Sequence, residues 1–369
     1  MVYFHQIMSS PRPIPLQTLV AQDCNRMAWH GQTGHYEVWF LTLAHRESKT
    51  GFWIRYTLES PEPGHGSPYA ELWFCRSDGK NPVKSFGIHR RFDIANLHSQ
   101  QRPFVVRISG SELGHSHASG SMSGDGHTIR WDLHWDGQSR PHLLLPRALY
   151  SNPMGIAETI VLSPNHSIAV SGTIEIDGER YELNQSPAGQ SHLWGKKHAY
   201  GWAWARCNAF DREDEQPTQT PKAVFESLTV RLRRGPVVLP LTMMSMYPDG
   251  FGGKEIAFKE WTDLPLTRAE YRTGSYVLSA EGPRTGLEVQ FSCSADDMLR
   301  TEYVDPDGTP AFNHYAGAAS CTMLLKRRLC PGAAWRIERT FRSDQGAQFE
   351  WAGRAGDSLV RKRHVLVND

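Results

Sequence analysis

Runs of alternating apolar and polar residues, rich in aromatic and β-branched types, dominate this chain. Near the N-terminus, residues 35–43, 51–58 and 69–75 all have this pattern. Because successive side chains of a strand point to opposite faces of a sheet, the alternation predicts half-buried β-strands. Long helical periodicity is hard to find, so the sequence predicts an all-β protein of antiparallel strands, arranged as β-sandwiches or β-barrels. Further strands are expected at residues 223–233, 236–246, 276–280, 286–292, 321–328 and 335–341.

The chain length and the turn positions indicate two β units. The 369 residues exceed the size of one small domain. Asp-Gly pairs at residues 125–126 and 177–178 suit tight hairpin turns, because both residue types tolerate positive φ angles. The polar segment 184–190 interrupts the strand pattern near the middle of the chain. We therefore expect an N-terminal β unit over residues 1–186 and a C-terminal β unit over residues 187–369.

Composition argues against several classes of protein. The chain has 40 Lys plus Arg and 39 Asp plus Glu, a formal net charge of +1, so no basic excess points to nucleic acid. Residues 1–15 lack the apolar run of a signal peptide, and no stretch approaches the length of a transmembrane helix. The six cysteines are scattered without a C-x-x-C pair, which favours reduced thiols. We expect a cytoplasmic protein with no integral membrane segment.

The 17 histidines raise the question of a metal site. His115 and His117 would share one face of a strand, as a metal site needs. A cupin-like site would also need a glutamate four residues later, where Ser121 stands, and the neighbourhood is rich in Gly and Ser. The sequence has no phosphate-binding loop, no G-x-G-x-x-G after a strand and no G-x-S-x-G elbow. We therefore expect neither a metal nor a cofactor.

The most informative segment is residues 190–210, which read QSHLWGKKHAYGWAWARCNAF. In a strand that begins at residue 201, one face carries Trp202, Trp204, Arg206 and Asn208. The small residues between them form the other face and permit close packing against another layer. Two indoles with a guanidinium and an amide suit the wall of a pocket that orients a ligand. An Arg stacked on Trp and hydrogen-bonded to backbone would give the same pattern.

A family resemblance rests on this segment. His-x-Trp-Gly followed by Trp-x-Trp-x-x-Cys-Asn-x-Phe resembles the hydroxyneurosporene synthase (carotenoid 1,2-hydratase) and AttH-like group, which is similar to tocopherol cyclases and to lipocalin-like pericyclases. Residues 36–40 and 52–57 resemble the opening strands of that group. The resemblance implies tandem lipocalin-like domains. It also implies carbocation-type cyclisation or hydration of isoprenoids, cofactor-free pericyclic ring closure, or ligand binding alone.

The resemblance also implies site residues. A His-x-Trp pair and a downstream Tyr-x-Asp are implicated in the hydratases, and His192 with Trp194 matches the first. Tyr247 and Asp249 spell the second, although Asp249 precedes a glycine and would also suit a turn. Glu37, among strand aromatics, is a rival acid, with a structural hydrogen bond as its alternative role. A pericyclic reaction would need no acid.

Two hypotheses follow. In the first, the protein is a cofactor-independent cyclase, isomerase or hydratase for a hydrophobic isoprenoid, polyene or polyketide-like molecule, in which His192 and Asp249 handle the proton. In the second, it is a non-catalytic carrier of a lipophilic small molecule. Both need an apolar pocket between the two halves. The residues expected to contact the ligand are Trp194, Trp202, Trp204, Arg206, Asn208, Trp39, Tyr56 and Tyr247.

Overall fold

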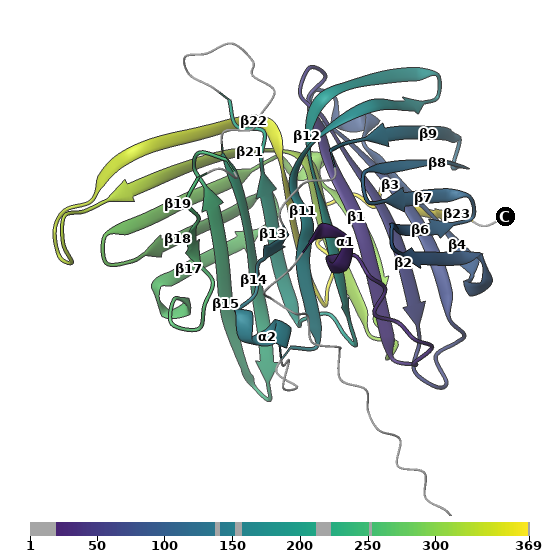
Figure 1. The fold of residues 1–369 in the computed structure, drawn as a ribbon, viewed down its shortest axis with the longest axis horizontal. Helices are drawn as coiled ribbons and strands as arrows, with labels where there is room; N and C mark the ends of the chain where they lie inside the picture. The colour runs from purple at the N-terminus through teal and green to yellow at the C-terminus, as the bar shows by residue number, and fades with distance from the viewer. Residues whose placement is uncertain (1–19, 137–140, 152–156, 212–222, 251–252, 368–369) are drawn as a thin grey trace, which may run out of the picture.

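The computed structural model describes residues 20–136, 141–151, 157–211, 223–250 and 253–367 (Figure 1). Residues 1–15, considered above for a signal peptide, lie outside this range. The described residues form two large β-sheets with a few short helices, so the expected all-β class is confirmed. The alternating runs at residues 35–43, 51–58 and 69–75 all lie in strands, as the pattern predicted.

The first sheet has 13 strands and comes almost entirely from the N-terminal half of the chain (Figure 1). All its neighbouring strands are antiparallel except β23 and β4, which are parallel. From one end to the other its strands are β23 (His364–Val367), β4 (Phe86–Asp93), β3 (Tyr69–Asp78), β2 (Thr50–Ser60), β1 (His35–His45), β12 (Glu179–Gly195), β11 (Thr159–Ile176), β9 (His127–His134), β8 (His117–Gly124), β7 (Ser111–Gly114), β6 (Phe104–Ile108) and β5 (Leu97–Gln101), and β10 (His142–Leu143) pairs with β11.

The second sheet has 10 strands, all antiparallel to their neighbours. In order they are β16 (Ile256–Phe258), β15 (Val237–Tyr247), β14 (Val224–Arg234), β13 (Gly201–Cys207), β22 (Arg336–Gly353), β21 (Pro310–Arg327), β19 (Thr285–Ser292), β18 (Ser275–Glu281) and β17 (Thr267–Arg272), and β20 (Leu299–Val304) pairs with β21.

Helical structure among the described residues is short. The α-helices are α1 (Ala21–Cys24) and α2 (Arg147–Ser151), and the 3-10 helices are η2 (Pro82–Lys84), η3 (Ile94–Asn96), η4 (Leu264–Leu266) and η5 (Ala295–Asp297). No helix in these parts of the chain is long and apolar enough to span a membrane. All six cysteines are free thiols.

The chain passes from the first sheet to the second between Gly195 and Gly201. The segment 184–190, which we interpreted as an interruption, instead lies within β12 and pairs with β11 and β1. We misinterpreted this segment because some of its polar residues are buried and hydrogen-bonded within the protein. The Gln190 side chain, for example, is buried and accepts from Asn25 and Asn165. The C-terminal β23 returns to the first sheet. A division into units at residues 186/187 stays a prediction.

Each sheet has its own hydrophobic core, and a third core lies between the sheets. Ala203 and Ala205 of β13 pack in the core of the second sheet, and Trp202 and Trp204 lie in the core between the sheets. The two faces predicted for this strand are therefore confirmed. The core between the sheets also receives large side chains from the first sheet, such as Trp53 of β2.

Two glycines lie where the backbones of the two sheets come close together. A Cβ atom on Gly51 of β2 would lie well inside van der Waals contact with the carbonyl oxygen of Gly317 of β21. The Gly317 amide donates to Ser77 Oγ of β3 at 3.0 Å, so that backbone is fixed in place. The sheets therefore meet backbone to backbone here, which only glycine permits.

We predict that Gly51→Ala lowers the free energy of unfolding by about 3 kcal/mol, because the new methyl group must push two sheets apart. Gly353→Ala is the control: it also lies in a strand, and a Cβ atom there meets nothing within 4 Å. That control should change stability by about 0.5 kcal/mol or less. Denaturant unfolding of both variants tests this, and equal stabilities would contradict the close approach.

Candidate active site

A cavity of about 900 Å³ lies between the two sheets. Its walls come from β1, β11 and β12 of the first sheet and from β13, β14, β15 and β22 of the second, with α2 beside them. Most of the wall is apolar: Phe40, Leu149, Val161, Leu193, Trp202, Trp204, Leu228 and Met243. The lining also includes exposed residues, Arg233 and Arg234 among them, so the cavity opens to solvent there. Its size and lining suit a hydrophobic small molecule.

One carboxyl group in this wall, that of Glu350, is held by hydrogen bonds rather than by an ion pair. Glu350 of β22 accepts a hydrogen bond from Trp202 Nε1 at 3.1 Å on one oxygen and from Asn313 Nδ2 at 3.0 Å on the other. No Lys, Arg or His of the described chain forms an ion pair with it. Burial therefore raises the pKa of Glu350 above its ordinary value, and the hydrogen bonds and the charge of Arg55 offset this only in part. The surroundings of Glu350 therefore favour the acid form of its carboxyl group more than water does.

A neutral imidazole lies in the same wall. His198 Nδ1 lies 2.6 Å from Asp305 Oδ1, and the backbone amide of His198 also donates to that oxygen. Burial would raise the pKa of Asp305, but the hydrogen bonds from His198 and the pairing with Arg354 lower it, so Asp305 is a carboxylate. Nδ1 must then carry the proton, which leaves Nε2 as an acceptor. Burial lowers the pKa of His198, which keeps the ring neutral.

Trp202 connects these two groups. Its indole N–H donates to Glu350, and its ring stacks on the His198 ring with centroids 5.0 Å apart. Tyr36 of β1 stacks on the other side of His198 at 4.3 Å. The Glu350 carboxyl group, the His198 imidazole and the aromatic rings of Trp202 and Tyr36 therefore lie together in the cavity wall.

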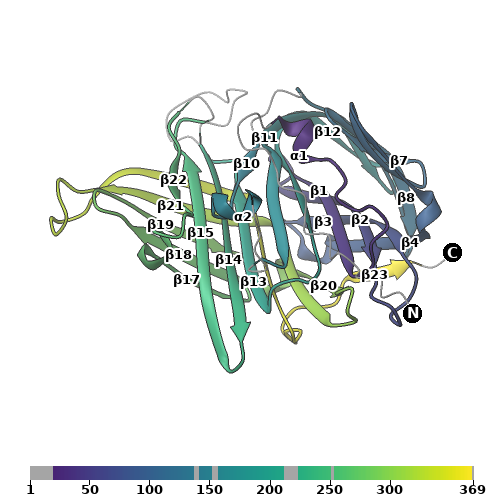
Figure 2. The ribbon, with the colours of Figure 1, turned by 60° about the horizontal axis from the view of Figure 1, so that its bottom comes forward.

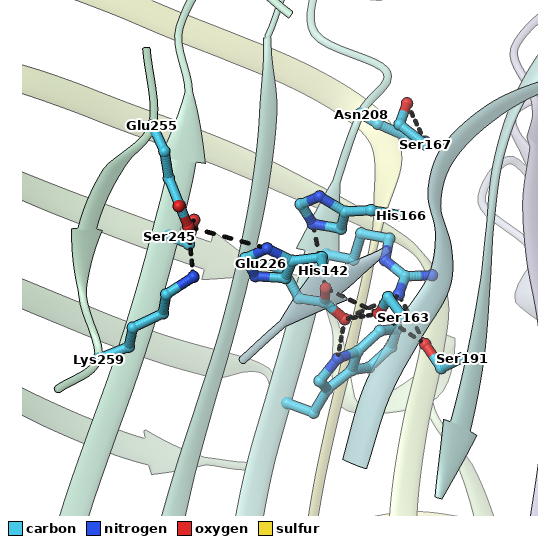
Figure 3. Close-up of polar contacts among 12 residues, drawn as sticks. His142, Ser163, His166, Ser167, Ser191, Asn208, Glu226, Ser245, Glu255 and Lys259 are labelled. Carbon is cyan, nitrogen blue, oxygen red and sulfur yellow. Dashed lines mark hydrogen bonds and ion pairs between the residues drawn. The ribbon is translucent and has the colours of Figure 1, made fainter. Parts of the chain in front are cut away.

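A buried cluster of charged and polar groups lies beside the cavity (Figure 3). Arg206 of β13 and Glu226 of β14 form an ion pair of 2.7 Å, and both side chains are almost completely buried. Arg206 also donates to Ser163 and Ser191 of the first sheet, at 2.7 and 2.6 Å. Trp204 Nε1 donates to Glu226 at 2.9 Å, which links the cluster to the cavity wall. Burial would raise the pKa of Glu226, but the Arg206 charge and the His166 hydrogen bond hold it well below its ordinary value.

Three residues of this cluster could hold a metal ion. The ligand atoms of His142, His166 and Glu226 all lie within 4.8 Å of one another. The imidazole rings of the two histidines are stacked with centroids 4.1 Å apart. The Glu226 carboxylate already accepts from Arg206, Trp204 and Ser163 and lies 3.0 Å from His166. These contacts satisfy the carboxylate without a metal, and the expected absence of a metal stays a prediction that elemental analysis can test.

Of the residues expected to contact a ligand, Trp202 and Trp204 lie in the cavity wall. Arg206 and Asn208 share their strand face but lie where the two sheets touch: Asn208 donates to the Ala188 carbonyl of β12. Trp39 and Tyr56 lie in the core of the first sheet. The described cavity lining likewise does not include Trp194 or Tyr247. A substrate-binding role for these residues stays a prediction.

His192 and Glu37 are in contact with each other in the interior, whereas Asp249 lies on the surface. Glu37 is fully buried and accepts from the amides of Ala28 and Trp29 at 2.7 and 2.9 Å. It also contacts His35 Nε2 at 3.2 Å and His192 Nε2 at 2.9 Å, and His192 Nδ1 donates to the Cys24 carbonyl at 2.6 Å. Burial would raise the pKa of Glu37, but its hydrogen bonds with His192 and His35 lower it. The pair therefore anchors residues 24–29 onto the first sheet.

Asp249 lies on the surface in the turn after β15. Its side chain is exposed and forms an ion pair with Arg339 at 2.6 Å. His192, by contrast, is buried and bonded to Glu37. The structure therefore does not bring Asp249 and His192 together, and their joint role in proton transfer stays a prediction.

Sequence reasoning missed both Glu350 and His198. His198 lies in the gap between the two parts of the central motif, in the connection from β12 to β13. Its position four residues before Trp202 in the sequence could have marked His198 as a candidate site residue. Glu350 lies between two aromatic residues, Phe349 and Trp351, in the last long strand, and Glu37 lies between Tyr36 and Val38 in the first. The pKa of Glu350 is raised and that of Glu37 is lowered because the two carboxyl groups have different hydrogen-bond partners in the folded structure, which the neighbouring sequence does not show.

Comparisons with known proteins fit this architecture. A family model described as tocopherol cyclase-like matches residues 118–224, a range that contains His198, Trp202 and Trp204 but not Glu350. An uncharacterized protein of Mycobacterium tuberculosis, found in strains CDC 1551 and H37Rv, is 24% identical over 287 residues, which cover 77% of this chain and 79% of the relative.

Two solved structures are also similar. An AttH candidate (NE1406) from Nitrosomonas europaea has a TM-score of 0.56 and 14% identity, with 93% of this chain and 99% of that chain covered. Kievitone hydratase from Nectria haematococca has a TM-score of 0.49 and 9% identity, with 86% and 88% covered. The first similarity defines the class of the fold: an AttH-like arrangement of two lipocalin-like β units, as the sequence resemblance implied.

We predict that Glu226→Gln lowers the free energy of unfolding by roughly 3–5 kcal/mol, because it leaves the Arg206 charge buried without a counter-ion. The control is Glu182→Gln, which removes an exposed pair with Arg180 and should cost about 0.5 kcal/mol or less. Urea unfolding of both variants measures the difference. Equal losses would show that the buried ion pair does not support the packing of the sheets.

The same pair has a defined pH dependence. Because folding lowers the pKa of Glu226, its stabilisation is complete above the ordinary glutamate pKa. It is then lost as the pH falls toward the lowered pKa of the folded state. Below about pH 4.3 the difference in stability between the unaltered protein and Glu226→Gln should therefore shrink.

Proposed function

We propose that this protein is a cofactor-independent enzyme that cyclises, isomerises or hydrates a hydrophobic small molecule of the isoprenoid, polyene or polyketide-like class. The observation that carries the proposal is the pairing of an uncompensated carboxyl group, Glu350, with a neutral imidazole, His198, in one apolar cavity. Enzymes separate an acid from a base at neutral pH by giving two groups such different environments. The match to the tocopherol cyclase-like model over residues 118–224 supports this class of reaction.

The chemistry needs only groups that the cavity wall supplies. The Glu350 carboxylic acid gives its proton to one carbon of a substrate C=C bond, and the other carbon becomes cationic. The faces of Trp202 and Trp204 stabilise that charge. An oxygen or a second C=C bond within the substrate closes a ring, or a water molecule adds. His198 Nε2 then accepts the proton that is lost, and proton return from His198 to Glu350 through solvent restores both groups.

This assignment differs from the one that the sequence suggested. Asp249 is exposed and ion-paired, and Glu37 accepts several hydrogen bonds that favour its carboxylate form. Glu37 is therefore a poorer proton donor than Glu350, and neither Glu37 nor Asp249 lies in the described lining of the cavity. A role for His192 in the reaction would have to act through residues 24–29, which it holds.

We predict that Glu350→Gln lowers turnover by about 10²–10⁴-fold, the usual contribution of a general acid, without loss of ligand binding. The reaction is screened with prenylated phenols and conjugated polyenes in D₂O, where protonation by the enzyme places deuterium on carbon. Binding is followed by the fluorescence of a conjugated polyene fatty acid. Glu338→Gln, an exposed position on the same strand, is the matched control and should behave as the unaltered protein.

The pH profile gives a second readout. Activity should fall as the pH rises through the raised pKa of Glu350, because the acid loses its proton. It should also fall as the pH drops through the lowered pKa of His198, because the base becomes protonated. Turnover by Glu350→Gln at the normal rate would exclude Glu350 as the acid. Retention of the polyene with no conversion by any form of the protein would instead favour the carrier.

A further inference from the structure

The hairpin that joins β14 to β15 ends in an exposed apolar tip. Val237, Val238 and Leu239 are 51%, 39% and 51% exposed. Because consecutive strand residues point to opposite faces, both faces of the tip are open to solvent. Figure 2 shows the hairpin extending past the ends of the neighbouring strands. Three large aliphatic side chains in a row on a projecting hairpin are unusual for a surface that meets only water.

The same hairpin carries basic side chains. Arg233 and Arg234 lie opposite Val238 and Val237 in the strand pair. Arg233 lies over the Tyr200 ring at 5.2 Å, and its Nε donates to the Gly235 carbonyl. Among the described residues neither arginine has an acidic partner. The whole chain has a formal net charge of only +1, so this positive charge is a local feature of the tip.

The tip borders the opening of the cavity. Arg233, Arg234 and Gly235 are part of the cavity lining, and so are Tyr200 and Trp261. Tyr200 and Trp261 are 38% and 41% exposed, so aromatic rings accompany the aliphatic tip at the opening. The acidic residue beside Trp261 is Glu260, whose carboxylate lies 3.9 Å from Arg147. The opening of the cavity therefore combines apolar, aromatic and basic side chains, and the exposed residues of the lining also include Glu158.

We propose that the β14–β15 tip, residues 231–240, docks on an anionic lipid surface and brings the opening of the cavity to that surface. Aliphatic side chains would enter the boundary between headgroups and acyl chains, Arg233 and Arg234 would pair with lipid phosphates, and the aromatic rings would lie at headgroup level. This inference rests on the proposed function in one respect, since a hydrophobic substrate dissolved in a bilayer would then enter the cavity without crossing water.

The test is flotation with vesicles of phosphatidylcholine alone and of phosphatidylcholine with phosphatidylglycerol. The unaltered protein should bind the anionic vesicles more tightly, and added salt should weaken that binding. Arg233→Gln with Arg234→Gln should lower the partition coefficient roughly 25-fold, at about 1 kcal/mol per basic residue. Val237→Ser with Leu239→Ser should lower it on both kinds of vesicle.

Matched controls lie on the second exposed hairpin of the same sheet, between β21 and β22. Leu329→Ser with Ile337→Ser removes aliphatic side chains that are more exposed than those of the tip, at 86% and 60%, and Arg336→Gln removes an exposed charge. These variants should bind vesicles as the unaltered protein does. All substituted positions are exposed, so folding should be unchanged, and circular dichroism checks it.

Two results would overturn the proposal: no binding of the unaltered protein to anionic vesicles, or equal losses in tip and control variants. The first result would favour a protein as the occupant of the tip. Vesicle binding does not require turnover, so Glu350→Gln should bind vesicles normally. An inactive protein that still docks through the tip would refute the proposed reaction and leave the docking surface intact.

Discussion

The buried ion pair between Arg206 and Glu226 determines how the two sheets can pack. A guanidinium between sheets is tolerated only when its charge is neutralised and its N–H groups are bonded, and Ser163 and Ser191 of the first sheet supply part of that bonding. Gly189 of β12 provides the space for the Arg206 side chain, since a Cβ atom at that position would collide with the guanidinium. The interface is therefore closed and polar at this end of β13. Farther along the same strand face it opens into the cavity.

Two glutamates near this strand have opposite pKa shifts for understandable reasons. Glu226 forms an ion pair with a buried cation, which lowers its pKa, whereas Glu350 accepts hydrogen bonds from two neutral donors and the charge of Arg55 offsets the effect of burial only in part, so its pKa is raised. The indole N–H of Trp204 donates to Glu226, and that of Trp202 donates to Glu350. The tryptophans thus form the wall of the cavity and also connect it to the charged cluster. Glu226 lies where the two sheets pack against each other around Arg206, and Glu350 lies where they leave the cavity open. The two carboxyl groups therefore have different surroundings although both accept from tryptophans of β13.

The sequence predicted what depends on local pattern. Alternation gave the strands and the two faces of β13, because side-chain direction in a strand follows from position alone. The alternation could not single out Glu350 as the proposed proton donor, because Glu350 lies 148 residues from Trp202, its hydrogen-bond donor. Glu37 also lies in a strand next to an aromatic residue, but in the folded structure its carboxyl group contacts His192 and two backbone amides. The polar segment 184–190 was misinterpreted for the same reason, since its buried hydrogen bonds come from distant residues.

The most direct test of this account is the protonation state of Glu350 at neutral pH. Infrared difference spectroscopy between the unaltered protein and Glu350→Gln isolates the carboxyl group of that residue. The account predicts a carboxylic acid C=O band in the unaltered protein that disappears in the variant and that fades as the pH is raised. A carboxylate signal for Glu350 at neutral pH would contradict the account, because the cavity would then contain no acid able to protonate an apolar substrate.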